Sequence, residues 1–236
     1  MDSDGAELIV KWYLEIEQRL FSILKTVPLS TDTEGVFLPS LSSIILESCS
    51  LIDTIFRDGY KPVAQAQNAN MPMYARYYEG IYELSSARTV IYNYPIQSLC
   101  PFENWMSPNG DYIPILWWQN YNKLKHDRIQ HFPLSTFRTA IDSLCALHQI
   151  LAYTPALIDA LTRHNLLCTL GINPAIITAW LKGEEEYDER YQALIETELF
   201  ATPRGSLTFP ENLQNANVRI YDMNHKFWKY VGFNNY

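Results

Sequence analysis

The sequence has few of the features that mark secreted, membrane-bound or metal-binding proteins. Its four cysteines show no CxxC or Cys/His spacing, so we expect reduced thiols and no zinc site. Its longest apolar runs, such as 113–118, are far too short to cross a bilayer, and the acidic start MDSDGAELIV argues against a secretory signal. We therefore expect a soluble protein of the cytoplasm, with no membrane partner.

Glycine and positive charge are also scarce. With only 9 glycines, the chain has no phosphate-cradling glycine loop, and it has no HExxH or GxSxG motif. The net charge of −8 excludes a protein that coats nucleic acid with its whole surface, but it leaves room for one local basic site. We expect no cofactor and no metal.

What the sequence does contain is helical periodicity over most of its 236 residues. Apolar side chains recur every three or four positions, which predicts a mainly α fold, an antiparallel bundle of four to five helices. The predicted helices are Ala6 to Lys25, Leu38 to Arg57, Tyr74 to Leu84, Ile113 to Gln130, and one that Ser135 caps and that runs through Leu151. The segment 87–110, rich in proline and β-branched residues, predicts irregular structure with a short strand.

The regular helical periodicity of the chain ends at about residue 165. Asn173-Pro174 predicts the start of a short helix, and the acidic run GEEEYDER is typical of a solvated face. The rest predicts loops and a small hairpin. We therefore divide the chain into a helical bundle, 1–165, and a small mixed C-terminal appendage, 166–236.

One predicted helix, WWQNYNKLKHDR, is unusually polar. At about 100° per residue, Arg128 falls on the stripe of Trp117 and Tyr121, whereas Asn120, Lys123 and Asp127 fall on the opposite, solvated side. Charges on apolar faces need partners. Glu17 and His148 also fall inside apolar faces, so we expect a Glu17–Arg128 pair. The convergence of these groups fits a structural network or a site equally.

His126 lies at the edge of the same helix. Lys125 precedes it, which favours a neutral imidazole, and Asn122 lies one turn earlier. A neutral histidine with a cation that stabilises phosphate is the minimum set for metal-free RNA cleavage. The candidate catalytic residues are therefore His126, Arg128, Lys125 and Asn122. The alternative is an ordinary solvated helix end.

These residues also carry a resemblance. PF at 101–102, WW at 117–118, YNxxKHDR at 121–128 and the helix TFRTAIDSLCALHQIL together resemble a HEPN-type helical domain over about residues 6–152. The resemblance implies a helical bundle that is often dimeric. Many members are toxin or antiphage ribonucleases, and others are inactive binding modules.

The motif helix departs from the HEPN pattern. The family's catalytic pattern is an arginine followed four to six residues later by a histidine, and here only Arg219 and His225, in the appendage, fit it. Two hypotheses therefore stand: a metal-independent endoribonuclease of a toxin or defence system, or a non-catalytic module that binds a nucleotide or a partner protein. We expect a homodimer under either hypothesis, and the first requires RNA as a partner.

Overall fold

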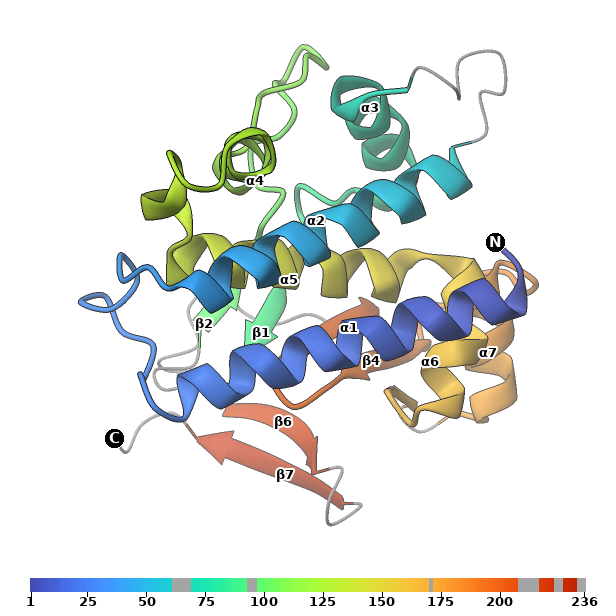
Figure 1. The fold of residues 1–236 in the computed structure, drawn as a ribbon. Coiled ribbons are helices and arrows are strands. Elements are labelled where there is room, and N and C mark those ends of the chain that lie inside the picture. The colour runs from blue at the N-terminus through green and yellow to red at the C-terminus, as the bar shows by residue number, and fades with distance from the viewer. Residues whose placement is uncertain (61–68, 93–96, 170–171, 208–216, 223–226, 233–236) are drawn as a thin grey trace.

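The computed structural model describes residues 1–60, 69–92, 97–169, 172–207, 217–222 and 227–232 (Figure 1). The helices are α1 (Ser3–Leu24), α2 (Pro39–Gly59), α3 (Met71–Tyr82), α4 (Leu116–His126), α5 (Phe137–Tyr153), α6 (Ile158–Arg163) and α7 (Pro174–Lys182), with short 3-10 turns η2 (Phe132–Leu134) and η3 (Pro155–Leu157). The strands are β1 (Thr89–Ile91), β2 (Gln97–Leu99), β3 (Leu167–Thr169), β4 (Gln192–Glu196), β5 (Phe200–Gly205), β6 (Asn217–Asp222) and β7 (Phe227–Gly232).

Side-chain caps set where several helices begin. Asp2 accepts a hydrogen bond from the backbone N–H of Gly5 at 2.8 Å and starts α1. At the start of α5 the capping side chain is Thr136, one residue after the predicted Ser135. The predicted start of α7 is confirmed, because Asn173 accepts from the N–H of Ala175 at 2.9 Å and Pro174 occupies the first turn.

A five-stranded antiparallel sheet makes the fold mixed α/β, so the predicted mainly α bundle is wrong. The strand order is β2-β1-β5-β4-β3. β1, which falls in the segment expected to hold a short strand, pairs with β5 through Val90 and Ala201. β5 pairs in turn with β4 over five residue pairs. Strands from both sides of residue 165 therefore form one sheet. β6 and β7 form a separate two-stranded hairpin.

The sheet is hidden in the sequence for physical reasons. Ala193, Leu194 and Ile195 of β4 are all buried, so β4 lacks the alternation of polar and apolar residues that marks a half-exposed strand. In β5, Pro203 argues against a strand because proline cannot donate a backbone hydrogen bond. Pro203 is tolerated because it pairs with Leu194 of β4 but lies beyond the two residues that pair with β1.

Helix α5 lies at the centre of the core. It is buried on all sides from Ser143 to Ala152, and it contacts α1, α2, α4 and strand β5. Figure 1 shows α1 and α2 crossing in front of α5 and the sheet. Within the described ranges, no single helix has the length and hydropathy of a membrane span; α5 and the segment Pro155–Arg163 pass only as a pair, bent by 86°.

Candidate functional site

Helix α4 ends at His126, four residues before the predicted end. Asp127 has extended backbone angles, φ −147° and ψ 95°, and its carboxylate accepts from the N–H of Gln130 at 2.9 Å to start a new turn. Arg128 therefore lies beyond the helix, and its predicted place on the stripe of Trp117 is wrong. Asn120, predicted to be solvated, is buried instead and donates to Thr139 Oγ1 at 3.1 Å.

The structure places the predicted catalytic residues around this helix end, mostly in solvent. Lys125, His126 and Arg128 are exposed and Asn122 is half-buried. Lys125 Nζ lies 5.5 Å from the centroid of the Tyr121 ring. Among the described residues, no side chain forms a hydrogen bond with the His126 ring, so Asn122 does not orient it.

The lysine and arginine side chains at this helix end lack the ion pairs that most other lysines and arginines in the described part of the chain form. Eight lysines and arginines elsewhere lie within 4.0 Å of a carboxylate: Lys11, Arg19, Arg57, Arg76, Arg138, Arg163, Lys182 and Arg190. In the described part of the chain, no acid lies within 4.0 Å of Lys123, Lys125 or Arg128. We call Lys123, Lys125, His126 and Arg128 the basic end.

The predicted Glu17–Arg128 pair is wrong, because Glu17 points into the core and Arg128 points out of it. Glu17 is 1% exposed. Its Oε1 accepts from the hydroxyl of Thr197 and, at 3.4 Å, from the N–H of Leu199. The partners of Glu17 thus come from the turn between β4 and β5, which the sequence does not link to α1.

Glu17 and His148 do converge, as their apolar faces predict, and Tyr13 joins them. The Tyr13 hydroxyl lies 2.9 Å from Glu17 Oε1 and 2.9 Å from His148 Nδ1. The other ring nitrogen of His148 lies 3.2 Å from the carbonyl oxygen of Ile195. The sequence could have indicated Tyr13 as a member of this network, because it lies one turn before Glu17 on the same apolar face.

Burial shifts the pKa values of both titratable groups in this network, Tyr13–Glu17–His148, toward their neutral forms. It raises the pKa of Glu17 to about 7 and lowers the pKa of His148 to about 3, so the imidazole is neutral at pH 7. A neutral His148 donates from Nε2 to the carbonyl of Ile195, which leaves Nδ1 as an acceptor. The Tyr13 hydroxyl lies within hydrogen-bonding distance of this Nδ1 and of Glu17 Oε1, to which it donates. The network ties α1 and α5 to the sheet.

A second cluster, which the sequence did not suggest, surrounds Glu47 of α2. Its carboxylate accepts two hydrogen bonds from Arg19, at 2.9 and 2.6 Å, and one from Trp12 Nε1 at 3.1 Å. These hydrogen bonds lower the pKa of Glu47, and those from Arg19 have the largest effect. The charge of Arg128 acts in the same direction. Glu47 therefore connects α1 to α2, and α2 in turn contacts α4.

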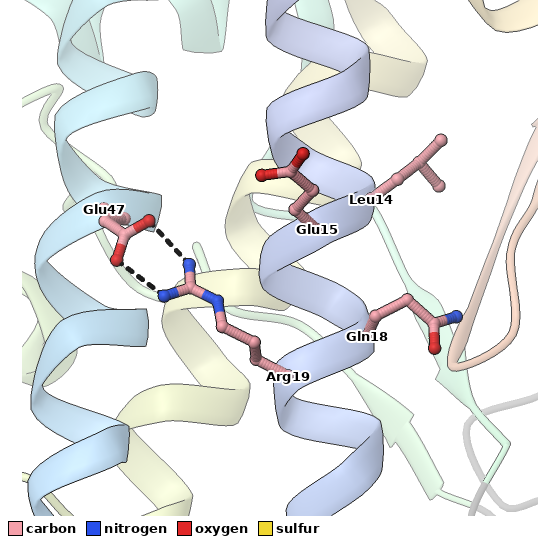
Figure 2. A pocket seen from close by; sticks show the side chains of 5 residues that line it. All are labelled: Leu14, Glu15, Gln18, Arg19 and Glu47. Carbon is pink, nitrogen blue, oxygen red and sulfur yellow. Dashed lines mark hydrogen bonds and ion pairs between the residues drawn. The ribbon is translucent and has the colours of Figure 1, made fainter.

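The Glu47 cluster borders an open hollow over α1. The hollow has a volume of about 560 Å³ and is lined by Leu14, Glu15, Gln18, Arg19 and Glu47. Figure 2 shows Arg19 and Glu15 pointing toward α2, where Arg19 meets Glu47, while Leu14 and Gln18 point to the other side.

Other candidate chemistries find no support in the described residues. No group of three or more His, Cys, Asp or Glu side chains there is placed to hold a metal ion. All four cysteines are free. Burial raises the pKa of Cys100 to about 11 and of Cys168 to about 12, so both thiols are poor nucleophiles at neutral pH. The Arg219 side chain and all of His225 lie outside the described residues.

Comparison with known proteins adds no family. No protein-family model, no curated protein and no solved structure matches the chain, so the HEPN resemblance stays a prediction.

Proposed function

We propose that the chain binds RNA in the cytoplasm through the basic end and does so without cleaving it. The observation that supports this proposal is the absence of acid partners for Lys123, Lys125 and Arg128 among the described residues, in a chain of net charge −8. Exposed cations without carboxylate partners are free to bind phosphate oxygens and to release the counterions of the RNA.

The location of the cations also has a local effect. Lys123, Lys125 and His126 lie in the last turn of α4, where positive charge interacts favourably with the helix dipole. That interaction leaves the ammonium hydrogens exposed to solvent, so it does not compete with a phosphate for hydrogen bonds. Arg128 lies outside the helix and gains little from the dipole.

Binding fits the geometry better than cleavage does. A general base needs an imidazole held in one orientation against the substrate. His126 is exposed, and neither Asn122 nor any other described residue fixes its ring. The HEPN resemblance includes inactive binding modules, and the missing Arg-to-His spacing agrees with that class.

A second candidate, binding of a partner protein, is favoured by one residue. Ile129 is 91% exposed and directly follows Arg128. An isolated apolar side chain beside cations suits a protein surface that presents an acidic rim around an apolar pocket. Retained RNA binding in an Ile129→Ser variant would separate this role from that of the cations.

The test is the affinity for a labelled single-stranded RNA, measured by fluorescence anisotropy. We expect Lys125→Glu/Arg128→Glu to weaken binding on the order of tenfold or more, and to flatten the salt dependence. The control, Arg76→Glu/Arg190→Glu, changes the net charge equally at two exposed, ion-paired positions and should bind like the wild type. No RNA binding by the wild type, or equal losses in both variants, would overturn the proposal.

A further inference from the structure

Trp12 is unusual because its ring is exposed although its indole N–H already forms a hydrogen bond within the protein. The indole is 43% exposed, yet Nε1 donates to Glu47 Oε2 at 3.1 Å. Glu47 is itself held by two hydrogen bonds from Arg19. The ring is thus held at one edge while much of its apolar surface remains in water.

Glu47 places this ring beside Arg19, because both bind the same carboxylate. Helix α2, which carries Glu47, also contacts α4, whose C-terminal turn carries the basic end. Arg19 also lines the open hollow over α1 (Figure 2). A fixed aromatic ring near a basic surface is the combination by which proteins bind unpaired bases, with the ring stacking on a base and the cations of the basic end following the backbone.

We propose that Trp12 is a stacking platform for one base of a single-stranded RNA whose phosphates bind the basic end. This inference rests on the proposed function, and it adds the class of RNA. Bases of a duplex are stacked on one another and cannot reach a side chain on α1, so the surface discriminates single strands from duplexes. Glu47 is a positioning residue, which holds Trp12 and Arg19.

The experiment compares Trp12→Ala with the wild type on a single-stranded RNA and on a duplex of the same sequence. We expect the variant to bind the single strand on the order of tenfold to hundredfold more weakly and to bind the duplex unchanged. Trp12→Phe keeps an aromatic face and should restore most of the affinity. Tyr187→Ala is the control, because Tyr187 is 56% exposed but lies between α7 and β4, outside the proposed surface.

The outcomes separate this inference from the proposed function. If Lys125→Glu/Arg128→Glu weakens binding but Trp12→Ala does not, the stacking role is wrong and the basic end stands. If Trp12→Ala weakens single-strand and duplex binding alike, its effect is not stacking, and the inference fails. If no variant changes binding, both proposals fail. Circular dichroism of each variant confirms that it is folded.

Discussion

The Tyr13 hydroxyl lies 2.9 Å from His148 Nδ1, and this hydrogen bond connects α1 to the central helix α5. Tyr13 also contacts Glu17, and burial raises the pKa of Glu17 while it lowers the pKa of His148. The stability of the fold should therefore respond to pH in two opposite ways.

Glu17→Gln should remove one of these responses. The pKa of Glu17 is raised from 4.5 to about 7, so the folded state keeps a proton that the unfolded state loses. The stabilisation is complete below pH 4.5 and is lost as the pH rises through 7. Relative to Glu17→Gln, we expect the wild type to lose about 3 kcal/mol over this window in urea unfolding. A constant difference between the two proteins would contradict the raised pKa.

His148→Gln should show the opposite slope. The pKa of His148 is lowered from 6.5 to about 3, so the unfolded state binds a proton that the folded state excludes. The wild type should gain stability relative to His148→Gln as the pH rises from about 3 to 6.5. Urea unfolding at several pH values measures this difference, and a falling difference would show that His148 is charged in the core.

Tyr13→Phe should destabilise the protein by about 1 to 3 kcal/mol, since it removes the hydroxyl that contacts both His148 Nδ1 and Glu17 Oε1 in a site closed to water. Tyr77→Phe serves as the comparison, because the Tyr77 side chain is half-buried and its hydroxyl has no hydrogen bond to a described residue. Chemical unfolding at pH 6 measures both. Equal effects of the two substitutions would show that the network contributes little.

Arg128→Met should leave stability within about 0.5 kcal/mol of the wild type, because exposed side chains without ion pairs contribute little. The Glu17–Arg128 pair expected from the sequence would instead give a loss of a few kcal/mol, because one partner of a buried pair would be left alone. Thermal unfolding distinguishes the two expectations, and a loss of several kcal/mol would restore a buried role for Arg128.

Purified protein should bind RNA without shortening it, with or without EDTA, and His126→Ala should leave the RNA equally intact. Gel analysis of end-labelled RNA after long incubation measures this. Metal-independent cleavage that His126→Ala abolishes would instead establish the nuclease first suggested by Lys125 and His126. Cleavage lost only in Arg219→Ala or His225→Ala would move the chemistry to the C-terminal part.

Association of two chains, which the HEPN resemblance implies, remains a prediction, and we expect it to involve the exposed side of α4. Trp118 is half-buried against the core, whereas Leu116 of the same helix is 69% exposed. We expect a dimer at micromolar concentration by light scattering, and Leu116→Glu should dissociate it. Ile176→Glu, at an exposed apolar position on α7, should not. A monomeric wild type would remove the prediction.

The sequence predicted the parts of the fold that depend on local periodicity. α1, α2 and α5 follow their apolar faces, and the inward positions of Glu17 and His148 are confirmed because each falls within such a face. The partner of Glu17 could not be found in this way. Thr197 lies 180 positions later in the chain, and only the strand pairing brings it to α1.

The candidate site was predicted only in part. The composition of the basic end was visible, but the end of α4 was not, because Asp127 stops the helix by bonding Gln130 rather than by a glycine or proline signal. The Trp12–Glu47 contact joins α1 to α2 across 35 positions. A local sequence pattern cannot predict a contact between residues so far apart in the chain.

The pairing of β1 with β5 also determines the order in which the protein can fold on the ribosome. β1 ends at Ile91, but its neighbour β5 begins only at Phe200. During translation one edge of β1 therefore stays unpaired until β5 has been made. Helix α5 is made before β5, so its apolar residues that contact β5 are uncovered during this time. An open strand edge and uncovered apolar surface favour aggregation of nascent chains. The sheet that joins the two parts of the chain can therefore form only late in synthesis.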